Sequence, residues 1–111
     1  MQKAKFATFV EFWSFYLAEH SSVANRRLHF FGTSLAIFIF LNAFIYLKPH
    51  YLLLAPLAGY LFAWIGHYIV EKNRPATFTY PLWSLRGDFK MFALMLTGRL
   101  STELAKYRKV A

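Results

Sequence analysis

The side chains best suited to chemistry in this sequence are three histidines, two of which stand just before a long apolar run. His20 and His29 lie nine residues apart in the stretch EHSSVANRRLHFFGT, and His67 follows in GHYIVEKNRPATF. Neutral imidazole binds iron, zinc, copper or nickel, and three imidazoles around one ion leave positions open for substrate and oxygen. The chain has no cysteine, which excludes disulfides and thiolate metal ligands. The three histidines are therefore the candidate catalytic and metal-binding residues.

The elements that must position these histidines are unusually apolar. The chain has 111 residues and is 58% hydrophobic, more apolar surface than a soluble protein of this size can easily bury. Residues 30–47 and 51–70 form uncharged runs of 18 and 20 residues, close to the ~20 that a helix needs to cross a bilayer core. Only residues 48–50 separate the runs, so the second helix must return antiparallel to the first. The sequence predicts a transmembrane hairpin.

The predicted fold is an all-α membrane protein with a single membrane-embedded domain over residues 1–111. In this small helical bundle the hairpin is flanked by N- and C-terminal helices that are amphipathic or partly inserted. The predicted elements are an amphipathic helix over 4–20, a helix over 22–47 containing the first span, the second span over 51–71, a loop over 72–87 and a helix over 88–107. Ser21 and Ser22 are candidate N-caps of the second helix. Pro75, Pro81 and Gly87 indicate the loop, and Asp88 could cap the last helix.

The distribution of charge predicts the orientation of the hairpin. The chain carries 13 Lys and Arg against 5 Asp and Glu, a formal net charge of +8. Basic residues flank both outer ends of the hairpin, and Lys48 alone lies in its turn. The flanking residues are Lys3, Lys5, Arg26, Arg27, Lys72, Arg74, Arg86 and Lys90. Both termini of this multi-pass protein should therefore be cytoplasmic, in a bacterial inner membrane or, in a eukaryote, the endoplasmic reticulum. No basic, base-stacking module stands apart from the membrane segments, so we expect no nucleic-acid partner.

Depth in the membrane brings the three histidines together. His29 lies 19 residues before Lys48 and His67 lies 19 after it, so both stand about 28 Å from the turn on neighbouring helices. His20 would face the opposite side from His29 on one straight helix, because nine steps of ~100° separate them. A turn at the serines lets the two converge. His50, in the hairpin turn, is at the wrong depth.

Other polar residues near this level are candidate partners of a metal site. Glu71 shares a helix face with His67. Glu71 and Asp88 are candidates either as further ligands or, with Asn25, for orienting the ligands, although pairing with Lys72 or Arg86 and helix capping compete for the two acids. Arg26 and Arg27 are candidates for holding an anionic substrate headgroup, against a plain role as topology determinants.

Three ordered motifs carry a family resemblance. The runs EHSSVANRRLHFFGT, GHYIVEKNRPATF and PLWSLRGD, within about Phe15 to Met91, resemble a family formerly catalogued as a domain of unknown function. Its named member is the yeast protein for metabolism of phytosphingosine to odd-numbered fatty acids. The resemblance implies a membrane-embedded, iron(II)-dependent dioxygenase that shortens 2-hydroxy fatty acids by one carbon. It assigns the essential histidines to His20, His29 and His67.

The resemblance further implies Fe(2+) as cofactor, a 2-hydroxy fatty acid and dioxygen as substrates, and the lipid bilayer as surroundings. Arg26, Arg27 and Arg74 become candidates for binding the substrate carboxylate. Two other functions stay open: a non-enzymatic hairpin that shapes membranes or binds larger subunits, and an electron carrier in which His29 and His67 on facing helices bind haem. The oligomeric state also stays open, a homo-oligomer included.

Overall fold

The structure is a computed structural model that describes residues 6–108, and all of its regular elements are helical. They are α1 (Phe9–Ala18), α2 (Val23–Ile45), α3 (Tyr51–Ile65), the π-helix η1 (Gly66–Glu71), the 3-10 turn η2 (Ala76–Phe78), α4 (Pro81–Leu96) and α5 (Leu100–Arg108). No strand occurs within residues 6–108, which confirms the all-α prediction. The chain divides into two compact units, one of residues 20–75 and one of residues 6–19 with 76–108.

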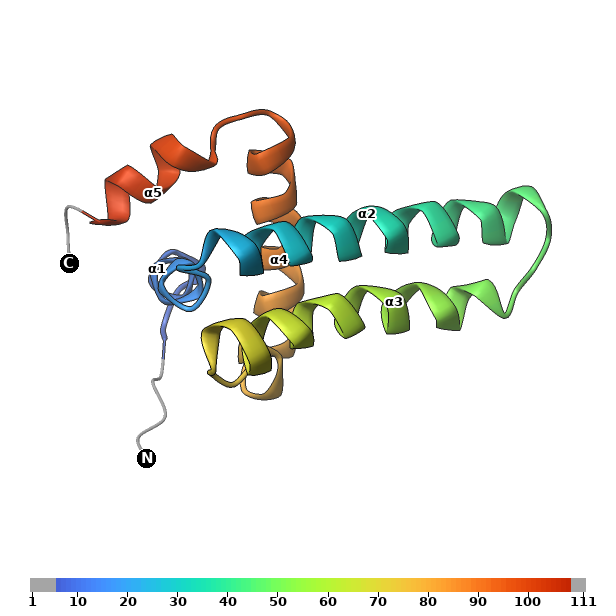
Figure 1. Cartoon of the computed structure of the whole chain (residues 1–111), viewed down its shortest axis with the longest axis horizontal. Helices are drawn as coiled ribbons and strands as arrows, with labels where there is room; N and C mark the ends of the chain where they lie inside the picture. The colour runs from blue at the N-terminus through green and yellow to red at the C-terminus, as the bar shows by residue number, and fades with distance from the viewer. Residues whose placement is uncertain (1–5, 109–111) are drawn as a thin grey trace. The chain divides into compact units, whose positions relative to one another are not determined.

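Residues 20–75 form the predicted antiparallel hairpin, in which α2 and α3 pack side by side (Figure 1). The backbones approach closely where Gly32 meets Gly59. A Cβ on Gly32 would lie 2.9 Å from the Cβ of Phe62 and 3.1 Å from the carbonyl oxygen of Gly59. Glycine at position 32 therefore allows the two helices to pack this closely.

Few side chains of the hairpin are buried. Within the apolar windows of Val23–Ile45 and Tyr51–Glu71, only 17% and 22% of the residues are buried. Large apolar side chains such as Phe38, Leu53 and Leu57 are exposed. A core helix of a soluble protein would bury a continuous apolar stripe. The hairpin thus has two helices that are long and apolar enough to cross a membrane, and their outward-facing surface is apolar.

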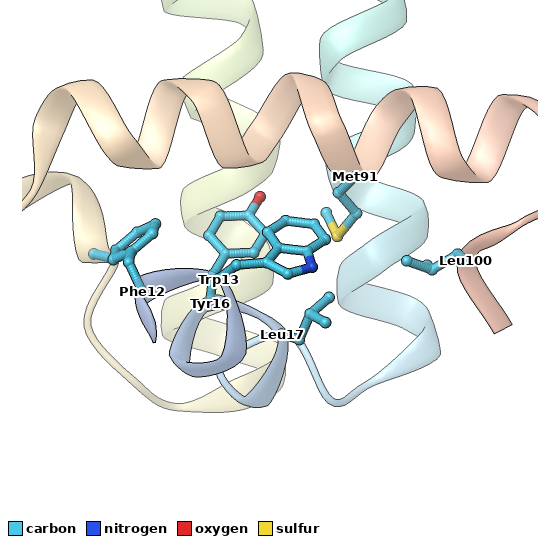
Figure 2. Packing of buried hydrophobic residues seen from close by; sticks show 7 residues of the cluster. Phe12, Trp13, Tyr16, Leu17, Met91 and Leu100 are labelled. Carbon is cyan, nitrogen blue, oxygen red and sulfur yellow. The ribbon is translucent and has the colours of Figure 1, made fainter. Parts of the chain in front are cut away.

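The other unit is built around the aromatic face of α1. Thr8 caps this helix by accepting a hydrogen bond from the backbone N–H of Glu11. Figure 2 shows buried side chains of three helices gathered together: Phe12, Trp13, Tyr16 and Leu17 of α1, Met91 of α4 and Leu100 of α5. We expected the apolar face of a helix over 4–20 to lie on a membrane. It packs against protein instead, because α4 and α5 supply an apolar surface that local periodicity does not disclose.

The C-terminal part differs from the predicted loop over 72–87 and single helix over 88–107. Pro81 lies in the first turn of α4, where its fixed φ suits a helix and its missing N–H costs no hydrogen bond. Gly87 lies inside α4, where a Cβ would come within 3.0 Å of the Tyr16 ring. Gly98, with a φ of 73°, follows the end of α4 and lets the chain turn into α5. Pro81, which indicated a loop, therefore starts α4. Gly87, which also indicated a loop, lets α4 pack against Tyr16 of α1.

Asp88 does not cap a helix, because it lies in the middle of α4. Its carboxyl accepts a hydrogen bond from the Tyr16 hydroxyl through Oδ1. Asp88 as a whole residue is half-buried, but its carboxyl group is surrounded by protein atoms. Burial raises the pKa of Asp88 to about 7, outweighing the Tyr16 hydrogen bond, which lowers it. Burial also raises the pKa of Tyr16, with a further contribution from the Asp88 charge.

These shifts predict that stability depends on pH through Asp88. The carboxyl binds its proton more tightly in the folded state, with a pKa of about 7 against an ordinary 3.8. The contribution of the protonated carboxyl to the stability of the fold is therefore complete below pH ~4 and is lost as pH rises towards ~7. Asp88→Asn keeps an acceptor for Tyr16 without a charge. Between pH 5 and pH 8, the free energy of unfolding of wild type should fall by ~1–2 kcal/mol more than that of Asp88→Asn. This figure is reduced for solvent screening.

The measurement is thermal unfolding in detergent, followed by circular dichroism at both pH values. Glu11→Gln removes an exposed carboxylate from the same unit and serves as the control. If Asp88→Asn and wild type lose the same stability between pH 5 and pH 8, Asp88 is not the group responsible.

Candidate metal centre

Three histidines converge within the unit of residues 20–75. His20 lies in the turn after α1, His29 in the second turn of α2, and His67 in η1. All three are buried, with exposed fractions of 2%, 5% and 3%. One nitrogen from each ring lies within 4.8 Å of the others, and the Nε2 atoms of His20 and His29 are 3.1 Å apart. His50 is exposed at the start of α3 and is not part of this group.

Hydrogen bonds orient two of the rings. His29 Nδ1 lies 3.0 Å from the carbonyl oxygen of Asn25, one turn earlier in α2. A carbonyl can only accept, so Nδ1 carries the hydrogen and Nε2 of the neutral ring keeps a lone pair. His67 Nδ1 lies 2.7 Å from Oδ1 of Asn73, which imposes the same tautomer. Both rings thus present a metal-binding nitrogen.

This donor set fits a transition-metal ion. Metal–imidazole bonds of ~2.0–2.1 Å place two neighbouring ligand nitrogens on one ion about 2.8–3.4 Å apart, depending on whether the geometry is octahedral or tetrahedral. The separation of 3.1 Å between the Nε2 atoms of His20 and His29 lies in that range, and a His67 nitrogen lies within 4.8 Å of both, so that ring must move closer to share one ion with them. Burial removes competing water, and hydrogen bonds to the far side of a ligating imidazole fix its orientation and raise its basicity. Three neutral nitrogens suit iron, zinc, copper or nickel alike.

The backbone around His67 departs from a regular α-helix. Residues Gly66–Glu71 form a π-helix that ends at Lys72 in the left-handed conformation, with a φ of 61°. This turn brings the chain back, so that the Asn73 N–H donates to the His67 carbonyl and the Asn73 side chain reaches the His67 ring. Sequence reasoning treated 51–71 as one regular helix and missed the role of Asn73. Its only sequence indication was a polar residue shortly after a histidine at the end of an apolar run.

The candidate partner residues lie in different places. Asn25 is fully buried beside Gly66, and a Cβ on Gly66 would collide with the Asn25 side chain. Glu71 accepts a hydrogen bond from Nδ2 of Asn25. Asp88 belongs to the other unit, where it accepts the bond from Tyr16.

The three arginines also differ in their surroundings. Arg26 donates through Nη1 to the carbonyl oxygens of His20 and Ser21, at 2.8 and 2.9 Å. Arg27 is exposed, and two helical steps of ~100° direct it away from His29. Arg74 is exposed and follows Asn73 directly. Arg26 thus holds the turn that carries His20.

A comparison with protein-family models matches residues 6–100 to a family described as 2-hydroxy-palmitic acid dioxygenase Mpo1-like. The chain belongs to the Mpo1-like family. This confirms the resemblance that the three motifs indicated, and the match covers all three buried histidines and both apolar helices. Comparisons with curated proteins and with solved structures gave no match.

The geometry predicts that this Mpo1-like protein binds about one transition-metal ion per chain. His20→Ala, His29→Ala and His67→Ala should each weaken binding roughly 100-fold or more, because a direct ligand matters more than its supporting partners, worth 10–100-fold. His50→Ala is the matched control and should bind as wild type. Metal analysis after anaerobic purification measures the stoichiometry. Equal metal loss in His50→Ala, with helix content retained, would contradict the three-histidine centre.

Proposed function

We propose that the protein is an iron(II)-dependent dioxygenase that shortens 2-hydroxy fatty acids by one carbon. The observation that carries this proposal is the buried group of His20, His29 and His67 in a chain of the Mpo1-like family. The family description supplies the reaction class and the kind of substrate. A dioxygenase needs a redox-active metal, which favours iron over zinc among the ions that imidazoles accept.

The overall reaction balances without a further reductant. A 2-hydroxy acid and one dioxygen give the acid one carbon shorter, carbon dioxide and one water, so the substrate supplies all the electrons. When bound, iron would supply the coordination positions for substrate and dioxygen and the electron-transfer chemistry. The chain's own part is to bring three buried imidazoles together, to fix the tautomers of His29 and His67, and to keep the site away from bulk water.

The hairpin suits an amphiphilic substrate. The histidines lie near the open ends of α2 and of the helix α3–η1, and large apolar side chains are exposed along the rest of both helices. The acyl tail can stay against apolar surface while the carboxylate and hydroxyl reach the polar end. Arg26, Arg27 and Arg74 are the cationic candidates for the carboxylate. Arg26 is favoured because it is three residues from His29, on the same side of α2.

The geometry argues against the haem-binding alternative. Two axial imidazoles on opposite faces of one haem iron would hold their ligating nitrogens about 4 Å apart, with the macrocycle between them. The centroids of the His29 and His67 rings are only 5.0 Å apart, and the His20 ring adjoins both, which leaves no room for such a macrocycle between them. A hairpin that only shapes membranes would need the apolar helices but not three buried imidazoles.

We further propose that the hairpin is inserted with both chain ends in the cytoplasm. Reporters fused to either end should both give a cytoplasmic signal, and a tag inserted at His50 should be accessible from outside, because the basic residues flank the open end of the hairpin. Accessibility of the tags in intact cells is the measurement. Chain ends on opposite sides of the membrane would contradict the hairpin topology.

The reaction itself is directly testable. Iron-loaded protein in liposomes, given a long-chain 2-hydroxy fatty acid and dioxygen, should release carbon dioxide and the acid one carbon shorter, without 2-oxoglutarate or reduced nicotinamide. The matching acid without the hydroxyl should not react, since it cannot bind through two oxygens and be oriented. Product analysis by mass spectrometry measures both. Full iron occupancy with no turnover of short, medium or long 2-hydroxy acids would refute the assignment.

The same assay compares the arginines at saturating iron. If Arg26 holds the carboxylate equally in the ground and transition states, Arg26→Ala should raise KM more than it lowers kcat, and some loss of kcat is expected because Arg26 also holds the turn that carries His20. Arg27→Ala is the matched control because its side chain points away from His29. A larger KM effect of Arg27→Ala would reverse that assignment.

A further inference from the structure

Glu71, the last residue of η1, connects the end of the second apolar helix to the beginning of the first. Its carboxylate accepts three hydrogen bonds from residues 21–25. The donors are the Ser21 hydroxyl to Oε1 at 3.0 Å, the Ser22 backbone N–H to Oε2 at 2.6 Å and Nδ2 of Asn25 to Oε2 at 3.2 Å. Both carboxylate oxygens are therefore committed to one short segment of chain.

That segment carries His20 and leads into the helix of His29. Ser22 is the N-cap of α2, and its hydroxyl accepts from the Asn25 N–H. Arg26 binds the carbonyl oxygens of His20 and Ser21 from the other side of the same turn. The turn is thus held at its N–H and hydroxyl groups by Glu71 and at its carbonyls by Arg26. The turn can therefore move little, and His20 stays close to the rings of His29 and His67.

The bond to Asn25 extends this control to His29. The Asn25 carbonyl orients the His29 ring, while the buried Asn25 side chain lies between Glu71 and Gly66. The Glu71 carboxylate determines which way the Asn25 amide points, because Oδ1 turned towards it would face a like charge. Oδ1 then lies against Gly66 and has no hydrogen-bond partner among residues 6–108, an arrangement costing ~1–3 kcal/mol that the bond to Glu71 offsets.

We propose that Glu71 is a positioning residue that aligns the three histidines before the metal binds. The proposal rests on the metal centre in the proposed function and adds a role outside the ligand set. Glu71 is hydrogen-bonded to the turn that contains His20 and to the helix that contains His29. His67 lies four residues before Glu71 in the same helix, η1. Among residues 6–108, the metal-capable group contains only the three histidines, so Glu71 acts through them.

Two substitutions separate position from charge. Glu71→Asp keeps the charge but withdraws the carboxylate by one methylene, about 1.5 Å, so that it cannot reach all three donors. Glu71→Gln removes the charge but keeps the length and an acceptor for Ser22 and Asn25, and its amide can donate to the Ser21 hydroxyl. If Glu71 acts by position, Asp should be the more damaging change of the two.

The test is anaerobic cobalt(II) titration of metal-free protein in detergent, followed by visible absorption. We expect Glu71→Asp and Glu71→Ala to bind cobalt 10–100-fold more weakly than wild type and with altered bands, because their ligand geometry has changed. Glu71→Gln should bind within about threefold of wild type and with the same bands. Glu11→Gln, an exposed acid in the other unit, controls for net charge. Circular dichroism checks that helix content is retained.

The outcomes separate this inference from the enzymatic assignment. Wild-type affinity in Glu71→Asp, or weaker binding by Glu71→Gln than by Glu71→Asp, would overturn the positioning role whatever the protein catalyses. The expected order of affinities together with no turnover of any 2-hydroxy acid would overturn the dioxygenase assignment and leave the positioning role supported. Failure of wild-type protein to bind cobalt would overturn the metal centre and the inference with it. If Glu71→Ala loses helix content, the cobalt affinities of Glu71→Asp and Glu71→Gln alone decide whether Glu71 positions the histidines.

Discussion

Three imidazoles can lie side by side away from water only if the nitrogen that each turns outward has a hydrogen-bond partner. An unpaired buried donor costs ~1–3 kcal/mol, a large part of the stability of a small protein. His29 finds its partner in a carbonyl of its own helix, and His67 finds one in the side chain of Asn73. The second solution requires the chain to reverse after the helix. The π-helix and the left-handed Lys72 accomplish that reversal.

The same requirement limits which residues can stand behind the histidines. Asn25 supplies a carbonyl to His29 and an amide to Glu71, and it is fully buried because Gly66 has no side chain to exclude it. Farther along the hairpin, Gly32 lets α2 and α3 approach. Histidines on two helices keep a constant separation only if the helices do not slide. The glycine contacts that pack the hairpin therefore also maintain the separation between His29 and His67.

The sequence alone predicted the convergence of the histidines because a short turn ties depth to distance along the chain. His29 and His67 lie equally far from Lys48, and the serines after His20 indicated the bend that the structure contains. Features that depend on residues far apart in sequence were missed. The Tyr16–Asp88 bond spans 72 residues, so nothing local distinguished Asp88 from a helix cap or a partner of the metal ligands. The burial of α1 and the start of α4 at Pro81 depend on the same distant packing.

The location of the site at the open end of the hairpin also follows from the supply of hydrogen bonds. Inside a regular helix almost every backbone N–H and carbonyl is already paired, so a polar cluster there would have to rely on side chains alone. Where helices end, backbone groups become available: the Ser22 N–H binds Glu71, and the His20 and Ser21 carbonyls bind Arg26. These bonds hold the turn that carries His20. A reaction that divides an amphiphilic substrate between a polar head and an apolar tail needs its polar groups at this same level. Backbone chemistry and the proposed substrate therefore favour the same position.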